Sequence, residues 1–282
     1  MIIDAHQHFW DPARADYPWM AAPELTPIRR AFAPADLAPL LRENGIDATI
    51  LVQCRSSLDE TEAFLRMAAD TPFIAGVVGW IDLTDGAAGE TLDRLHGLPG
   101  GEKLVGIRHQ VHDEADPDWL LREDVQRGLT AVFARDLAYD LLVRARELPA
   151  AIATARAFPQ ARFVLDHVAK PPIADGAIDE WAGRLAALAA CGNVWCKISG
   201  LATEANWDDW DPARLFPYVA HAAACFGEDR LIFGSDWPVC LLAGSYGEIK
   251  RALDECLMRL GPQFCDKAFG PNTRRAYRLA LA

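Results

Sequence analysis

The sequence predicts a (β/α)8 TIM barrel, which is an α/β fold. Eight short apolar runs rich in Val and Ile recur along the 282-residue chain, and segments with helical patterning separate them. Most of these runs are continuously apolar, which is typical of parallel strands covered on both faces. An open, doubly wound sheet is the alternative, but neither GxGxxG nor GxxxxGK(S/T) follows any run. Such barrels typically have about 250 residues, so we expect one domain over residues 1–282.

The eight expected strands begin at fairly regular intervals. They cover residues 2–10, 48–54, 73–81, 104–110, 139–146, 162–168, 194–200 and 231–238. In a barrel of this type the active site lies on the face where the strands end. The ends of the apolar runs are therefore the places to search for catalytic groups.

Start and stop signals mark helices between several of the strands. Prolines stand at first positions and glycines follow last positions, as in natural helix ends. We expect Ser57 and Glu60 to form a capping box, and Pro217 to divide its helix. The expected helices cover residues 35–44, 59–69, 150–158, 178–191, 212–226 and 245–260.

Composition excludes several classes of protein. The net charge is −12 with no basic tract, which disfavours binding to nucleic acid. No stretch approaches the roughly 20 apolar residues of a membrane span, and no signal peptide is recognisable at the N-terminus. The seven cysteines include no CxxC pair, so we expect reduced thiols in a cytoplasmic protein.

Residues 11–33 form a long and irregular connection after the first strand. Connections of this length are usually functional or lid-like. This one carries Tyr17 and Trp19 and directly follows Trp10. We expect Trp19 to contact a substrate.

The HxH motif that ends the first strand is the sharpest chemical feature. Residues two apart point to the same side of a strand, so the His6 and His8 side chains can converge. Together with His167 from the sixth strand and Asp236 from the eighth, they make a ligand set suited to Zn²⁺. Two alternatives stay open: His6 pairs with Asp4 at the barrel mouth, or Asp236 caps the following turn.

Other strand ends supply groups for catalysis and binding. Asp236 is the expected general base, acting on water, and His167 lies beside it. Arg108 is expected to stabilise a developing oxyanion. Asp166 is expected to orient His167 or to support its strand. Besides Trp19, the expected substrate-binding residues are Gln53, His109, Gln110, Lys170 and Lys197.

Several motifs together resemble one branch of a known superfamily. They are IIDAHQHFWDP followed by YPWM, VGIRHQVHDE, FVLDHVAKP, KISGL, FGSDWPV and FGPNTRRAY. With these motifs the whole chain resembles amidohydrolase-related family 2 of the amidohydrolase superfamily, in particular its sugar lactonases for fuconolactone and rhamnonolactone. The resemblance implies an amidohydrolase-type barrel that hydrolyses a sugar-acid lactone to the aldonate. The residues that match the family's site are His6, His8, His167, Asp236 and Arg108.

Two departures from the wider superfamily bear on the metal. The fourth strand ends in Arg108 and His109 rather than a bridging Lys or Glu, and the fifth offers no histidine. The resemblance therefore implies one divalent ion at most, and the branch also contains lactonases that need no metal. The alternatives are a metal-dependent decarboxylase, a pyrone-dicarboxylate-type lactonase and a non-catalytic sugar-binding protein. The expected partner is a small sugar lactone, and a homodimer is left open.

Overall fold

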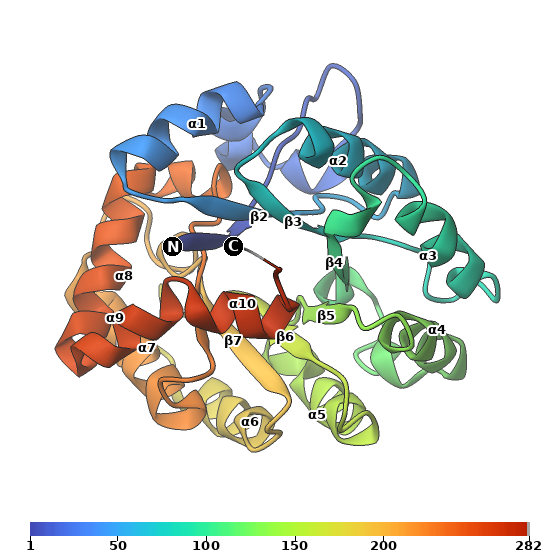
Figure 1. Cartoon of the computed structure of the whole chain (residues 1–282). Coiled ribbons are helices and arrows are strands. Elements are labelled where there is room, and N and C mark those ends of the chain that lie inside the picture. Colours follow the sequence, from blue (N-terminus) through green and yellow to red (C-terminus); the bar gives the residue numbers. More distant parts are fainter. Residues whose placement is uncertain (281–282) are drawn as a thin grey trace.

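The computed structural model describes residues 1–280 and contains an eight-stranded parallel sheet. The strands are hydrogen-bonded in the order of the sequence, and helices surround them (Figure 1). Their bounds are β1 Ile3–Gln7, β2 Ala48–Val52, β3 Ile74–Gly79, β4 Leu104–His109, β5 Ala138–Leu141, β6 Phe163–Leu165, β7 Val194–Ile198 and β8 Leu231–Phe233. The predicted (β/α)8 barrel is confirmed, with all eight strands where the apolar runs stand.

The sheet closes between β1 and the segment that follows β8. Gln7 and Trp237 form a parallel bridge, and the backbone N–H of Asp236 donates to the carbonyl of His6 at 2.8 Å. The register between β1 and β2 shifts between Asp4 and Gln7. Such an irregularity re-aims side chains locally, and here it lies beside His6.

Every strand ends earlier than the apolar run that predicted it. The helices between the strands are α1 Pro34–Glu43, α2 Leu58–Asp70, α3 Ala88–His96, α4 Glu123–Phe133, α5 Leu148–Ala157, α6 Asp179–Ala189, α7 Pro212–Phe226 and α8 Tyr246–Leu260. Two further helices follow, α9 Pro262–Ala268 and α10 Pro271–Tyr277. The sequence patterns did not identify α3, α4, α9 and α10.

Two local predictions were wrong. Pro217 does not divide its helix, because α7 continues through it. Pro217 removes one backbone donor, and the apolar face that buries Leu215, Val219 and Phe226 keeps the helix together. Ser57 does cap α2, but the Glu60 carboxylate accepts from the backbone N–H groups of residues 54 and 55 instead of completing a capping box.

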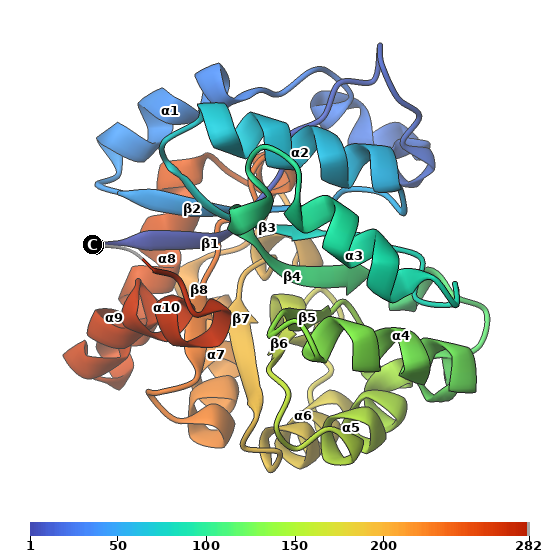
Figure 2. The ribbon, with the colours of Figure 1, turned by 45° about the vertical axis from the view of Figure 1, so that its right-hand side comes forward.

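Apolar side chains fill two layers of the molecule. The larger cluster lies between the sheet and the surrounding helices. A smaller one contains Ile3, Ala48 and Ile232 from the strands together with Tyr277 of α10. Figure 2 shows α10 lying across the end of the barrel where the strands begin. The end where the strands finish is thus left for the site.

The segment 11–33 is fixed to the barrel rather than free. Trp10 and Phe32 form an antiparallel bridge, and the Trp10 indole donates to the carbonyl of Ile28 at 3.1 Å. Two 3-10 helices, Pro18–Met20 and Pro23–Ile28, lie within it, and Met20 and Ile28 are buried. These contacts hold Trp19 at the site.

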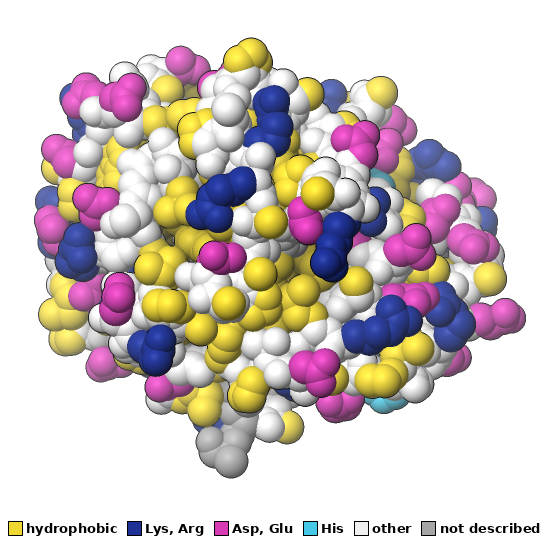
Figure 3. Space-filling view, turned by 90° about the horizontal axis from the view of Figure 1, so that it is seen from above, with side chains coloured by type: hydrophobic (Ala, Val, Ile, Leu, Met, Phe, Trp, Pro, Cys, Tyr) yellow, Lys and Arg dark blue, Asp and Glu magenta, His cyan; other side chains and the backbone are white. Residues whose placement is uncertain are grey.

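The charged side chains of the surface and the state of the cysteines are consistent with the composition. On the face shown in Figure 3, acidic and basic side chains are interspersed among apolar ones. Among residues 1–280, no helix is long and apolar enough to cross a membrane. All seven cysteines are free thiols, as predicted. Burial raises the pKa of Cys54 and of Cys240 well above 9.0, so neither thiol near a strand end is activated as a nucleophile.

Candidate active site

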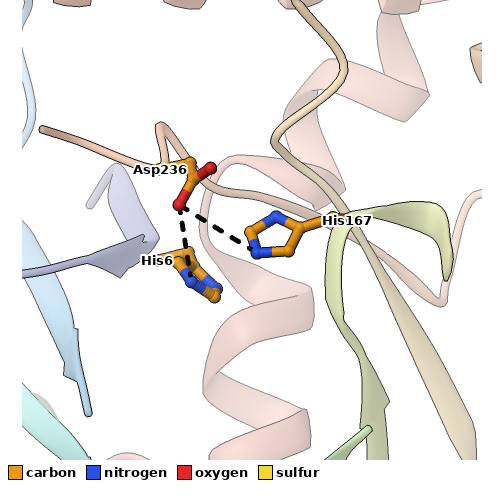
Figure 4. Close-up of side chains that lie close together, drawn as sticks. All are labelled: His6, His167 and Asp236. Atoms are coloured by element: carbon orange, nitrogen blue, oxygen red, sulfur yellow. Dashed lines mark ion pairs between the residues drawn. The ribbon is translucent and has the colours of Figure 1, made fainter. Parts of the chain in front are cut away.

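Side chains from β1 and from the segments that follow β1, β6 and β8 meet at the carboxyl end of the barrel. Asp236 Oδ1 lies 3.7 Å from Nε2 of His6 and 4.0 Å from Nε2 of His167 (Figure 4). The same oxygen lies 3.4 Å from Nε2 of His8, which in turn is 3.1 Å from Nε2 of His6. All four side chains are buried to at least nine-tenths. The convergence expected from the sequence is therefore present in the structure.

Unusual backbone conformations place two of these side chains. Residues His167 to Lys170 all have φ between 51 and 57°, and Asp236 has φ of 59°. Such left-handed conformations are uncommon for residues other than glycine, and they concentrate at functional sites. Here they turn the chain sharply after β6 and β8, so His167 and Asp236 point into the cluster instead of continuing the strand alternation.

Outer contacts fix the orientation of the imidazoles. His8 Nδ1 donates to the Val52 carbonyl at 2.7 Å, and His167 Nδ1 lies 2.9 Å from Ser199 Oγ. His6 Nδ1 lies 3.4 Å from an oxygen of Asp166. Each ring thus engages its partner through Nδ1 and turns Nε2 towards Asp236. Metal-binding histidines are commonly held in this way.

The geometry does not match the two alternative roles, which were pairing of His6 with Asp4 and capping of the following turn by Asp236. The Asp4 carboxylate accepts from the backbone N–H groups of His6 and Ser235 and from the Tyr246 hydroxyl, so it does not pair with the His6 ring. The carbonyl of Asp236, not its carboxylate, accepts from the N–H of Cys240 in the next turn. Asp236 keeps its carboxylate for the cluster.

Burial and nearby charges keep His6 and His167 neutral and Asp236 ionised. Burial lowers the pKa of both His6 and His167 well below 6.5. Burial alone would raise the pKa of Asp236, but His167 and a hydrogen bond with His8 bring it below 3.8. The Nε2 atoms of His6 and His167 therefore present lone pairs, and Asp236 carries a negative charge at neutral pH.

These donors fit a divalent ion. The possible ligand atoms of His6, His167 and Asp236 all lie within 4.8 Å of one another. Two nitrogens bound to one tetrahedral zinc lie roughly 3.3 Å apart, close to the 3.1 Å between Nε2 of His6 and of His8. Because Nδ1 of His8 is bound to the Val52 carbonyl, Nε2 is the atom of this ring that faces His6, and a cation could lie between the two Nε2 atoms.

A network of buried charges lies under the cluster. Arg108 Nη1 donates to Asp166 Oδ2 at 2.8 Å, and Lys197 Nζ lies 3.0 Å from Asp166 Oδ1. Lys197 also donates to Asp140 at 2.6 Å, and the Tyr277 hydroxyl of α10 donates to the same oxygen at 2.7 Å. The network joins the closed end of the barrel to His6 through complementary charges.

A cavity of about 460 Å³ opens above the cluster. That volume lies in the range of small-molecule sites, which is about 300–1,000 Å³. The expected residues that line it are His8, Trp19, Arg108, Gln110, His167, Lys170 and Asp236. His6 lies behind them and is fully buried.

Three expected substrate-binding residues do not line this cavity. Lys197 lies beneath the cluster with its ammonium bound to two carboxylates. His109 uses both ring nitrogens internally, since Nδ1 accepts from the Trp80 indole and Nε2 donates to Glu114. Gln53 is fully buried, and its side chain donates to the Arg108 carbonyl at 3.3 Å. Strand-end position alone did not reveal which of these side chains face inward or sideways.

Other residues of the cavity wall were missed. Thr203, Glu204 and Trp207 come from the loop after β7, and His112 and Asp113 from the loop after β4. Arg144 follows β5 and also lines the cavity. Glu204 accepts from Lys170 at 2.6 Å. Only Arg144 carried a sequence signal, its place at the end of an apolar run; the others stand in loops whose path the sequence pattern does not predict.

Comparisons with known proteins cover the full barrel. An L-fucono-1,5-lactonase of Burkholderia ambifaria is 43% identical over 281 residues, which span 98% of this chain and 95% of that protein. An L-fucono-1,5-lactonase of Burkholderia multivorans is 39% identical, covering 98% and 96%. Crystal structures of an amidohydrolase from Burkholderia multivorans, one with bound zinc and one with bound HEPES, match with a TM-score of 0.93 at 38% identity over 99% of both chains.

The family model agrees with these similarities. The amidohydrolase model matches residues 3–279, a range that includes every strand of the barrel and the whole cluster of His6, His8, His167 and Asp236. The chain belongs to the amidohydrolase family.

Proposed function

We propose that this protein is a lactonase that hydrolyses a neutral sugar-acid lactone, such as L-fucono-1,5-lactone, to the open aldonate. The observation that carries the proposal is the position of Asp236, an ionised carboxylate within 4.0 Å of three imidazole nitrogens on the wall of a small-molecule cavity. The two curated lactonases with 43% and 39% identity over almost the whole chain support the substrate class.

Asp236 and Arg108 have separate roles in the proposed hydrolysis. Asp236 accepts a proton from water as the water oxygen attacks the lactone carbonyl carbon. Arg108 donates N–H groups to the carbonyl oxygen, where negative charge develops, and His167 lies on the same wall. As the bond to the ring oxygen breaks, the proton held by Asp236 passes to that oxygen, which leaves a hydroxyl and a carboxylic acid. The acid then releases its proton to solvent and becomes the aldonate.

We also propose that His6, His8, His167 and Asp236 hold one divalent ion, with zinc the best match to their donors. The zinc-bound relative with 38% identity supports this assignment. When bound, the ion would supply Lewis-acid polarisation of the carbonyl. Elemental analysis, with lactonase assays before and after chelation, measures how much of the activity depends on it.

The charge of the cavity supports a neutral substrate over a dicarboxylate. Three cationic residues line it, Arg108, Arg144 and Lys170, and so do three acidic ones, Asp113, Glu204 and Asp236. Arg108 already pairs with Asp166, and Lys170 with Glu204. A dianionic pyrone would require several convergent free arginines. We therefore place Trp19, Gln110 and Lys170 against sugar hydroxyls and the sugar face.

An assay with a panel of lactones and a pH indicator tests the function. We expect acid release from sugar 1,5-lactones, and a loss of about 10²–10⁴-fold in kcat for Asp236→Asn. Asp113→Asn is the matched control, because Asp113 lines the same cavity without touching the cluster. Hydrolysis restricted to a dianionic pyrone, or release of CO₂ from an aromatic acid, would contradict the proposal. Full sugar affinity with no turnover would indicate a binding protein. A homodimer and a cytoplasmic location stay predictions.

A further inference from the structure

Arg108 contacts the cluster of His6, His8, His167 and Asp236 through His6. Its Nη1 lies 3.2 Å from Nε2 of His6, on the side of the ring that faces Asp236 and His8. The same guanidinium donates to Asp166 at 2.8 Å and to the Gln53 carbonyl. Arg108 is almost fully buried and lines the cavity. A permanent positive charge is thus held against a nitrogen that belongs to the candidate metal site.

His6 has only one lone pair to offer at Nε2. Asp166 Oδ1 lies 3.4 Å from Nδ1 and is an acceptor, so the ring proton resides on Nδ1. Lys197 Nζ is 3.3 Å from Nδ1, but it donates a shorter hydrogen bond to Asp140 at 2.6 Å and forms an ion pair with Asp166 at 3.0 Å. The Nε2 lone pair can accept from the Arg108 N–H or bind a metal ion, and it cannot do both.

We infer that Arg108 competes with the metal ion for His6 Nε2. This inference rests on the metal site proposed above. A guanidinium stays charged in proteins, so it weakens metal binding both by occupying the lone pair and by repelling a divalent cation. A metal ion that takes the lone pair releases one Nη1–H of Arg108, which then faces the cavity and the substrate carbonyl.

The competition predicts a change in zinc affinity, which can be measured without an activity assay. Arg108→Met frees His6 Nε2 and removes the charge, while Asp166 keeps its contact with Lys197. We expect this variant to bind Zn²⁺ at least about tenfold more tightly than the wild type, measured by competition with a chromophoric chelator. The rise in Tm on adding Zn²⁺ should also be larger in the variant, because tighter binding to the folded state stabilises it more.

Two further variants separate the effect of the Arg108–His6 contact from the effect of positive charge near the metal site. Lys170→Met removes one positive charge from the same cavity wall without touching His6, and we expect less than a threefold change in zinc affinity. Arg108→Lys keeps the charge but loses the planar fork that reaches Asp166 and His6 together. We expect an affinity between those of wild type and Arg108→Met, and this variant serves if Arg108→Met does not fold.

The outcomes distinguish this inference from the metal site itself. Zinc binding by the wild type with equal or weaker binding by both Arg108 variants overturns the competition and leaves the metal site standing. Equal tightening in Lys170→Met and Arg108→Met also overturns it, since long-range charge alone would then be responsible. Absence of zinc binding in all four proteins overturns the metal site and the competition together. Tightening confined to the Arg108 variants supports the inference.

Discussion

Lys197 Nζ lies 3.0 Å from Asp166 Oδ1, and neither side chain is exposed to solvent. The same ammonium donates to Asp140, so one buried cation joins two buried carboxylates on neighbouring parts of the barrel. Asp166 in turn accepts from Arg108 and faces the ring of His6. The position of His6 therefore depends partly on Lys197, Asp140 and Asp166, whose charges do not line the cavity.

Lys197→Met should strongly destabilise the fold. The substitution leaves the buried Asp140 without its cation, and Asp166 keeps only Arg108. Breaking a buried ion pair in this way typically costs about 3–5 kcal/mol. Urea unfolding at pH 7 measures the loss.

Lys267→Met is the matched control for that measurement. Lys267 also contacts two carboxylates, those of Glu228 and Asp229, but these groups lie at the surface. Surface pairs contribute about 0–1 kcal/mol, so this loss should be small. Equal losses in the two variants would show that burial of the Lys197 network has no energetic consequence.

Glu60 gives the stability a pH dependence. Burial raises its pKa from 4.5 to about 7, although two backbone N–H groups oppose the shift. The folded state therefore binds this proton more tightly than the unfolded state, and the resulting stabilisation is complete below pH 4.5 and lost as the pH rises through 7. Glu60→Gln cannot lose a proton, so its stability relative to wild type should rise by about 3 kcal/mol between pH 4.5 and 8. Urea unfolding across this range gives the difference.

Glu62→Gln on the same helix should not show the rise in stability between pH 4.5 and 8. The pKa of Glu62 is lowered, mainly by its hydrogen bond from Arg94, so its ionised form stabilises the folded state above pH 4.5. Relative to wild type, this variant should lose stability as the pH rises to about 4.5 and should change little between pH 4.5 and 8, where Glu62 stays ionised. The same slope for both variants would contradict the burial argument for Glu60.

The barrel and the cluster of His6, His8, His167 and Asp236 could be predicted from the sequence because both depend on short-range patterns. Continuous apolar runs identify strands covered on both faces, and a polar residue at the end of such a run lies on the catalytic face. His6, His167 and Asp236 were found in this way. The left-handed turn over residues 167–170 was not predicted, since no glycine marks it and tertiary contacts alone hold it.

The direction of each strand-end side chain could not be predicted from position. Lys197 and Lys170 both stand near strand ends, yet one is buried under the cluster and the other lines the cavity. Lys197 lies within β7, whereas Lys170 lies in the left-handed turn after β6, and neither the end of the strand nor this turn has a local sequence signal. Loop residues such as Trp207 reach the cavity only through the path of their loops.

Trp19→Phe should weaken substrate binding more than turnover. The indole lines the cavity, and its buried Nε1 has no partner among the described residues. A substrate hydroxyl that accepts from it would contribute about 0.5–1.5 kcal/mol, so we expect KM to rise roughly 3–10-fold with kcat little changed. Trp207→Phe is the control, because its Nε1 already donates to Thr203 and is not available to substrate. A larger KM effect in the control would argue against this role for Trp19.

Gly200→Ala should disable the site, although residue 200 takes no part in the chemistry. A methyl group there would lie 2.7 Å from Nδ1 of His167, and Gly200 also has a φ of +64°. The imidazole would have to move, and we expect losses of about 100-fold in kcat/KM and about 10–100-fold in zinc affinity. Gly227→Ala separates backbone strain from collision, because Gly227 has a φ of +66° with nothing within 4 Å. That control should lose about 1–2 kcal/mol of stability and keep its activity. Wild-type kcat/KM in Gly200→Ala would show that the position of the His167 ring does not limit the reaction.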